Sequence, residues 1–267
     1  MSKKIFLVDV NRCNGCHNCQ IACKDEHCGT NWLPYAAEQP DTGQFWCQVK
    51  QEVHGSVPKV NMTYMPLIGA QTEAIREYAP EVLMEREDGL VVIDPEKAKG
   101  REDIAEKFEG VFWNAELNIP QGCTGCAHLL DDGWTVPRCV DACAVGGMRF
   151  GDEADFADEI ARAEVLRPEL GTAPRVYYLN RPHLFVNGEV WDPEANEVVI
   201  GAKVCLTCPD GTTLEEATDE FGEFWFKRID AGTYSLAIEA EGFAPVSKEG
   251  IVLTDKGVNI GDFPLGK

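Results

Sequence analysis

The stretch that decides the fold is residues 13–28, CNGCHNCQIACKDEHC, which contains five cysteines. The first four are spaced Cys13-x2-Cys16-x2-Cys19-x3-Cys23. This spacing is typical of the runs that bind cubane iron–sulfur clusters in bacterial ferredoxins. A tight loop can present three thiolates to three corners of a cube, whereas the fourth thiolate points away and serves another cluster. The run is therefore predicted to be incomplete on its own.

A second block, Cys123-x2-Cys126-x12-Cys139-x3-Cys143, supplies the thiolates that the first run lacks. Each block lends its last cysteine to the cluster of the other block. We therefore predict two [4Fe–4S] clusters and no catalytic residue. The predicted ligands are Cys13, Cys16, Cys19 and Cys143 for cluster one, and Cys23, Cys123, Cys126 and Cys139 for cluster two.

Structural zinc is the alternative interpretation, because two sets of four cysteines could each close a tetrahedral site. Zinc usually takes its ligands as two separated pairs, and the dense run that starts at Cys13 fits that pattern poorly. His17 and His128 lie inside the cluster loops and are expected to be loop residues with solvated rings, not ligands. Hydrogen bonds from such rings to sulfur could still tune a cluster.

The remaining cysteines are expected to be structural residues or free thiols: Cys28, Cys47, Cys205 and Cys208. Cys205 and Cys208 are spaced like a redox pair, but they lie in or beside a predicted strand. A redox pair would open a helix, where the helix N-terminus lowers the thiol pKa. We therefore interpret these two as partly buried free thiols.

The charge balance excludes several classes of function. Lys and Arg number 24 against 45 Asp and Glu, and the resulting net charge of −21 repels nucleic acid and anionic lipid. No apolar run is long enough to cross a bilayer, and the start of the sequence does not resemble a signal peptide. Twelve cysteines without such a signal favour metal thiolates in a reducing compartment, so we expect a cytoplasmic protein.

The chain is expected to have an α+β fold with three zones. Residues 1–162 form the predicted ferredoxin-like iron–sulfur domain, with KKIFLVDV as its first strand. Residues 163–197 are an extended connector. The stretch DEADFADEIARAEVLRPELG, residues 152–171, is expected to begin as an acidic helical piece that stops near Pro168 and Gly171. Residues 198–267 show short alternating runs between turns, which predicts an antiparallel β-sandwich.

Faces of that sandwich can be predicted from the alternation. Ala202, Val204 and Leu206 should face one way, and Phe224 and Phe226 should share a face.

The strings CNGCHNCQIACKDEH, CTGCAHLLDDG and PRCVDACAVGGMRF resemble the iron–sulfur electron-transfer subunit of the dimethyl-sulfoxide-reductase family of molybdopterin enzymes. EREDGLVVIDPEKAKG and RPELGTAPRVYY, with the appended β-domain, narrow the resemblance. They are similar to the β subunit of pyrogallol–phloroglucinol transhydroxylase and the small subunit of anaerobic resorcinol hydroxylase. The resemblance implies a double-ferredoxin domain of the four-motif type and a transthyretin-like or collagen-adhesin B-type C-terminal module.

The resemblance also implies a partner. Catalysis would belong to a large molybdopterin subunit that carries molybdenum or tungsten with two pterins, in a heterodimer or a higher assembly. The complex would be an anaerobic phenolic hydroxylase or transhydroxylase, and this chain would be its wiring. Alternatives are the wiring subunit of a catechol dehydroxylase or another reductase, a stand-alone ferredoxin-type carrier, and a structural or redox-sensing protein.

The sequence departs from the four-motif pattern in its middle. The two middle motifs should fall near 64–80 and 104–114, and neither stretch contains a cysteine. Gly69, Thr72 and Phe108 stand roughly where thiolates are expected, so the clusters of these motifs cannot form. Because those clusters lead outward in the family, we expect a short wire. Its other partner would be a soluble electron acceptor or donor, or the wire would buffer electrons internally, with no membrane quinone.

Overall fold

The computed structural model describes residues 3–57, 59–69, 72–166 and 175–267. The chain forms two compact units, the first comprising 1–51 and 63–181 and the second 52–62 and 182–267. Strands β2 (Cys47–Ser56) and β3 (Lys59–Ile68) form a hairpin whose base belongs to the first unit and whose tip belongs to the second. No helix within these described ranges is long and apolar enough to span a bilayer.

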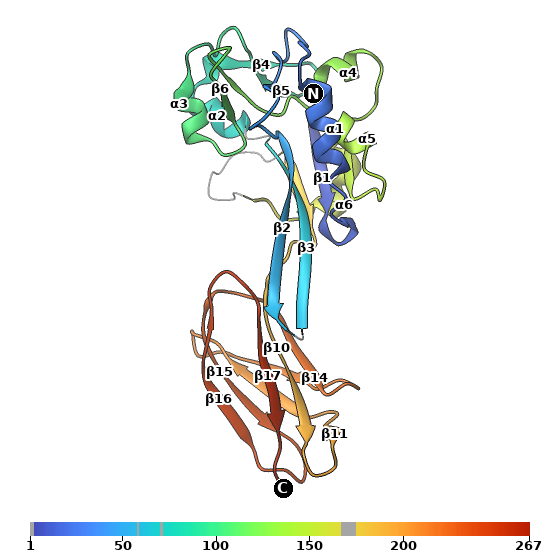
Figure 1. Cartoon of the computed structure of the whole chain (residues 1–267), viewed down its shortest axis with the longest axis vertical. Helices are drawn as coiled ribbons and strands as arrows, with labels where there is room; N and C mark the ends of the chain where they lie inside the picture. The colour runs from blue at the N-terminus through green and yellow to red at the C-terminus, as the bar shows by residue number, and fades with distance from the viewer. Residues whose placement is uncertain (1–2, 58, 70–71, 167–174) are drawn as a thin grey trace. The chain divides into compact units, whose positions relative to one another are not determined.

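A three-stranded sheet organises the first unit (Figure 1). Its central strand β1 (Lys4–Asp9) pairs antiparallel with β8 (Met148–Asp152) and parallel with β9 (Val176–Leu179). Alternate residues of β1 enter different apolar cores, because successive side chains of a strand point to opposite faces. Both faces are covered, which explains the unbroken run IFLV and confirms the predicted first strand.

Short helices follow the cysteine loops. The chain leaves β1 through a 3-10 turn, η1 (Val10–Arg12), passes the first loop and enters α1 (Asn18–His27). The second cysteine block, which runs from Cys123 to Cys143, contains α4 (Ala127–Asp131) and α5 (Arg138–Asp141), and α1 packs against α5. The two cysteine blocks, about 100 residues apart in sequence, are thereby brought together.

The middle of the chain forms a small helix-and-hairpin layer with its own core. Its helical elements are α2 (Thr72–Tyr78), η2 (Pro80–Val82) and α3 (Glu102–Lys107). Its strands form two hairpins, β4 (Leu83–Glu85) with β5 (Val91–Ile93), and β6 (Phe112–Asn114) with β7 (Ile119–Gln121). Strands are therefore present in GLVVID and VFWN.

The acidic segment after β8 is less helical than the sequence suggests. It contains η3 (Glu153–Phe156) and α6 (Ala157–Ile160), after which the chain leaves the helix. The stop expected near Pro168 and Gly171 lies outside the described residues. The expected extended connector contributes strands to both units, because β9 joins the first sheet and β10 (Leu184–Asp192) joins the second unit.

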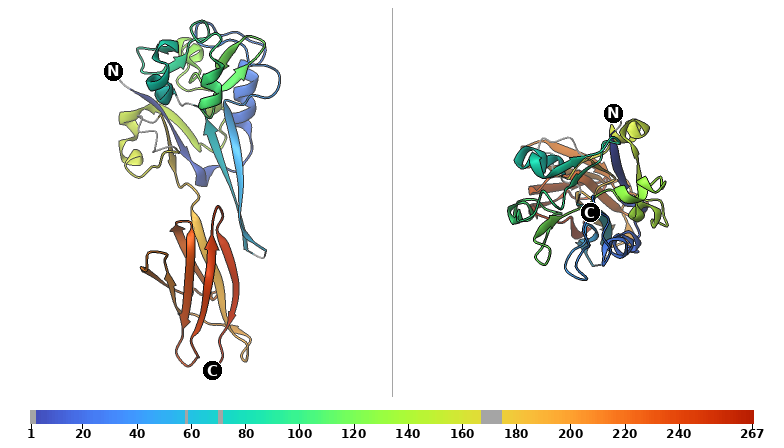
Figure 2. Two further views of the ribbon diagram at one scale, coloured as in Figure 1. Left: turned by 90° about the vertical axis from the view of Figure 1, so that its left-hand side faces the viewer. Right: turned by 90° about the horizontal axis from the view of Figure 1, so that it is seen from above.

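The second unit is a β-sandwich of two four-stranded sheets (Figure 2). One sheet contains β10, β11 (Glu197–Val198), β14 (Glu223–Ile229) and β17 (Val258–Pro264). The other contains β12 (Lys203–Thr207), β13 (Thr213–Ala217), β15 (Gly232–Glu239) and β16 (Val246–Leu253).

The predicted faces of the sandwich are confirmed. Ala202, Val204 and Leu206 enter its core together with Phe224 and Phe226. The expectation of a purely antiparallel sandwich is wrong, because β10 and β17 run parallel. Parallel neighbours need a long crossover, and here the chain makes the whole second sheet between them.

Candidate iron–sulfur site

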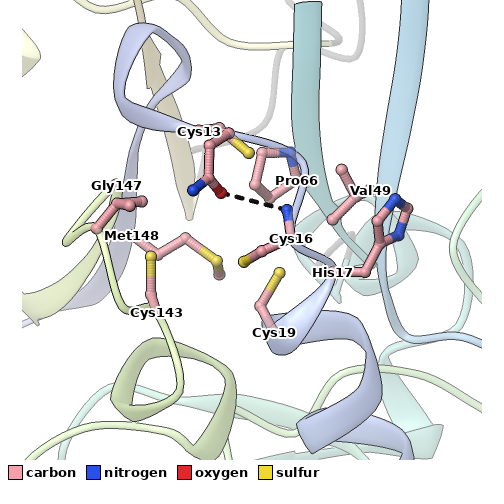
Figure 3. Close-up of a pocket in the computed structure, with 11 residues that line it drawn as sticks. Cys13, Cys16, His17, Cys19, Val49, Pro66, Cys143, Gly147 and Met148 are labelled. Carbon is pink, nitrogen blue, oxygen red and sulfur yellow. Dashed lines mark hydrogen bonds between the residues drawn. The ribbon is translucent and has the colours of Figure 1, made fainter.

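The four thiols predicted for cluster one line a common cavity of the first unit (Figure 3). The cavity contains about 320 Å³ of empty space, part of it open to solvent. Apolar residues complete the lining together with Asn14 and His17, and Cys16 is exposed to solvent. Its cysteines are Cys13, Cys16, Cys19 and Cys143. The structure therefore brings the last cysteine of the second block to the first three cysteines of the first.

The first loop holds its thiols with a left-handed turn. Gly15 has φ +71°, and its backbone N–H donates a hydrogen bond to the Cys13 sulfur. The backbone N–H of Cys16 donates to Asn14 Oδ1 at 3.2 Å. A Cβ at residue 15 would lie 2.5 Å from the ring of Tyr64, so both the conformation and the space require glycine.

The four thiols predicted for cluster two also form one group. Burial raises the pKa of Cys23, and negative charge on Cys139, Cys123 and Cys126 raises it further. Cys23, Cys126 and Cys139 are buried and Cys123 is partly buried, so this group is more enclosed than the first. Cys23 lies in the first run, but its thiol joins the cysteines of the second block.

The turn of the first loop recurs in the second. Gly125 has φ +62°, and its N–H donates to Cys123 Sγ at 3.4 Å. The next residue, Cys126, also has positive φ and precedes α4, as His17 does before α1. The sequence signal for this repeated turn is Cys-x-Gly-Cys, which occurs in both blocks.

The electrostatics of both groups suit a cationic cofactor. Burial raises the pKa of Cys13 and Cys126 and raises that of Cys123 to about 12. Thiolates crowded in an apolar site need a positive partner, and metal coordination deprotonates a thiol outright. Four thiols per group, with backbone N–H donors aimed at sulfur, fit an iron–sulfur cluster. Across the described ranges, no three His, Cys, Asp or Glu side chains are grouped to hold a single metal ion.

Four aromatic and imidazole rings lie against the second group. His128 stacks on Trp32 with ring centroids 4.2 Å apart, and its Nε2 lies 3.1 Å from Glu26 Oε1. The expected solvated ring is therefore wrong for His128, whose side chain is 8% exposed. His27 contacts Trp46, and its Nδ1 bonds the carbonyl oxygen of Cys23 at 2.9 Å. Burial lowers the pKa of His27 to about 4.

His17 behaves more like a loop residue. It precedes α1 with φ +60°, and its Nδ1 lies 3.4 Å from Gln20 Oε1. It is among the residues that line the first cavity, and its ring lies beside Val49 in Figure 3.

Backbone and apolar side chains fill the places where the two middle cysteine motifs are expected, at Gly69 and Phe108. A Cβ at Gly69 would overlap the carbonyl oxygen of Gly110. The Gly69 N–H donates to Trp46 O at 2.8 Å, and its carbonyl accepts from Cys123 N at 3.3 Å. Phe108 is buried in the core of this layer, and Thr72 begins α2. A side chain at residue 69 would therefore force the backbone to move.

Of the other cysteines, three lie away from both groups and one lies between them. Cys28 Sγ donates to Asp41 Oδ1 at 3.3 Å, and Cys205 and Cys208 lie in and just after β12, partly exposed. Cys47 is buried at the start of β2 and forms side-chain hydrogen bonds with Cys19 and Cys139. Its position was not predictable, because it follows no ligand spacing.

The fold and the thiol groups define an iron–sulfur protein with an appended β-sandwich. Residues 71–153 match the 4Fe-4S dicluster domain family, and residues 186–266 match the carboxypeptidase regulatory-like domain family. The chain is 34% identical to the small subunit of pyrogallol hydroxytransferase of Pelobacter acidigallici, over 99% of this chain and 100% of that one.

Two further relatives are subunits of other oxidoreductases. Identity is 30% to a subunit of the tetrathionate reductase of Salmonella typhimurium, over 68% of this chain and 74% of that one. It is 28% to a subunit of the anaerobic dimethyl sulfoxide reductase of Escherichia coli, over 72% and 89% respectively. The chain belongs to the family of iron–sulfur electron-transfer subunits of molybdopterin oxidoreductases, as its motifs predicted. It is a non-catalytic subunit of an oxidoreductase complex.

Proposed function

We propose that this chain carries two [4Fe–4S] clusters and conducts electrons for a large bis-pterin subunit with molybdenum or tungsten. One observation carries the proposal: the thiols gather in two groups of four, and each group takes one cysteine from the other block. Cys13, Cys16, Cys19 and Cys143 would hold cluster one. Cys23, Cys123, Cys126 and Cys139 would hold cluster two.

When bound, a cluster with four cysteine ligands supplies single-electron transfer and has no open iron site for a substrate. The chain's own residues provide the surroundings. The amides of Gly15 and Gly125 donate to ligand sulfurs, and such hydrogen bonds help to set a cluster's potential. The enclosed second group is shielded from water, whereas Cys16 places the first group at the surface.

The wire is proposed to end after two clusters. The overlap at Gly69 and the burial of Phe108 support this, because neither place has room for a thiolate and its iron. The first unit would then be a double-ferredoxin domain whose second half keeps its strands and has an apolar core in place of clusters. Electrons would reach a soluble acceptor or donor, or stay within the complex. The many reduced cysteines favour the cytoplasm.

The proposed reaction of the complex is hydroxylation or transhydroxylation of a phenol without oxygen. Full-length similarity to the pyrogallol hydroxytransferase small subunit, including the β-sandwich, supports this assignment. The tetrathionate and dimethyl sulfoxide reductase subunits are less similar and cover less of this chain.

Anaerobic purification from the native host tests the proposal. We expect about eight irons per chain, visible absorption that bleaches with dithionite, and a large pterin protein that co-purifies. A chain that runs alone with both clusters would be a ferredoxin-type carrier. About twelve irons or more would contradict the two-cluster wire, and a colourless protein with stoichiometric zinc would contradict the cluster assignment.

A further inference from the structure

Cys47 is a buried cysteine that belongs to neither proposed ligand set. It begins β2 and is 1% exposed. Its side chain forms hydrogen bonds with Cys19, which belongs to the first thiol group, and with Cys139, which belongs to the second. A single side chain therefore touches both groups.

The backbone of the same residue adds a further contact. The N–H of Cys47 donates a hydrogen bond to the sulfur of Cys23, another member of the second group. The position is fixed by its neighbour Trp46, which is 2% exposed and accepts a hydrogen bond from Gly69 N at 2.8 Å. Cys47 is thus held in the junction by strand and core, and not by a flexible loop.

The surroundings of Cys47 are apolar. Cys47, Cys19, Cys23 and Cys139 share one buried core, to which Tyr178 also belongs. Tyr178 donates its hydroxyl to Pro66 O at 3.0 Å. The side chain of Cys47 therefore lies among apolar groups and has the thiols of Cys19 and Cys139 as its hydrogen-bond partners.

A thiol has one hydrogen, so it can donate to one sulfur at a time. A hydrogen bond to a ligand sulfur stabilises the more negative, reduced form of a cluster and raises its potential. A donor placed between two ligand sulfurs therefore acts on whichever sulfur it serves at that moment.

We propose that Cys47 is a positioning residue that links the reduction potentials of the two clusters. It donates its S–H to Cys19 or to Cys139, and the sulfur that carries more negative charge takes the hydrogen bond. This inference rests on the proposed function, because it requires both clusters. It assigns Cys47 no ligand role.

The test uses the full chain, loaded anaerobically, with iron analysis and a redox titration followed by electron paramagnetic resonance. Cys47→Ala removes the donor, Cys47→Val removes it but restores packing volume, and Cys47→Ser keeps a donor. Cys28→Ala is the matched control, because its thiol bonds only Asp41 among the hydrogen bonds found for it. If Cys47→Ala does not fold, Cys47→Val still shows whether loss of the S–H donor changes the potentials.

We expect every variant to keep both clusters. At the wild-type midpoint potential, the Ala and Val variants should show about a tenfold lower ratio of reduced to oxidised cluster for at least one cluster. For a one-electron couple this corresponds to a shift of about 59 mV to more negative potential. Cys47→Ser should lie closer to wild type, and Cys28→Ala should match it.

Three outcomes would overturn the inference in distinguishable ways. Unchanged potentials in the Ala and Val variants would show that Cys47 does not act on the clusters. Loss of one cluster in all three Cys47 variants would make Cys47 a ligand. A wild-type chain without cubane clusters would remove the proposed function itself.

Discussion

Replacing Gly15 with Ala should damage the first cluster loop more than the same change at other left-handed glycines. Gly15, Gly125 and Gly29 all have positive φ. Placing an L-residue with a side chain in that conformation costs about 1–2 kcal/mol at each of them. Gly29→Ala measures this conformational cost without any steric overlap, because a Cβ at residue 29 would meet nothing within 4 Å.

The three positions differ in the space around the new methyl group. At Gly15 it would lie 2.5 Å from ring carbons of Tyr64, whereas at Gly125 the nearest atom is a methyl end of Leu90 at 3.0 Å. A ring held in a strand yields less easily than the end of a leucine. We therefore expect Gly15→Ala to lose about 1–3 kcal/mol more than Gly29→Ala, the usual cost of overpacking. Gly125→Ala should lie between them.

Anaerobic thermal unfolding of the iron-loaded chain measures this difference. At about 2–4 °C per kcal/mol, Gly15→Ala should unfold roughly 2–12 °C below Gly29→Ala. Adding Tyr64→Ala should remove the difference, because the two changes act on one contact. Equal melting temperatures for the Gly15 and Gly29 variants would refute the reasoning, as would a failure of Tyr64→Ala to relieve the Gly15 variant.

Three further outcomes are expected. Phe108→Ala should destabilise the chain by about 3–5 kcal/mol in thermal unfolding, as for a large buried ring, and leave the iron content unchanged; an unchanged melting temperature would contradict the burial of this ring. Gly69→Ala should lower the melting temperature more than Gly122→Ala. A methyl group at residue 69 would overlap the carbonyl oxygen of Gly110, whereas one at residue 122 would lie 3.5 Å from that oxygen. Equal melting temperatures would contradict the close approach of Gly69 to Gly110. Burial lowers the pKa of His27 from 6.5 to about 4. Between these two pH values the imidazole is protonated in the unfolded chain and neutral in the folded chain. The free energy of unfolding should therefore fall by roughly 3 kcal/mol as the pH falls from 6.5 toward 4. In denaturant unfolding at several pH values, His27→Phe should make the free energy of unfolding less dependent on pH over this range. An unchanged pH dependence would show that other groups cause it.

Local sequence pattern predicted much of the fold. The run KKIFLVDV indicated a first strand, and alternation indicated that Ala202, Val204 and Leu206 share one face of the sandwich. The parallel pairing of β10 with β17 could not be predicted, because strand direction depends on the path of the chain between strands. The acidic segment after β8 is also less helical than its composition suggests, with α6 ending at Ile160.

The grouping of the proposed ligands was predictable because cysteine spacing is a geometric constraint on a loop. The placement of Cys47 was not, since it depends on how the first residue of β2 meets Cys19 of α1 and Cys139 of α5, which are far from it in the sequence. His128 was misjudged for a similar reason. It belongs to the second cysteine block, but Trp32 and Glu26, which follow the first cysteine run in the sequence, cover its ring.

The crossed membership of the thiol groups is the central claim, and one measurement tests it directly. Electron paramagnetic resonance of the dithionite-reduced Cys23→Ala variant should show loss of the signal that Cys123→Ala also lacks. The signal lost in Cys16→Ala should remain, although Cys16 and Cys23 belong to the same run. If Cys23→Ala instead loses the signal that depends on Cys16, the first run closes its own cluster and the account is wrong.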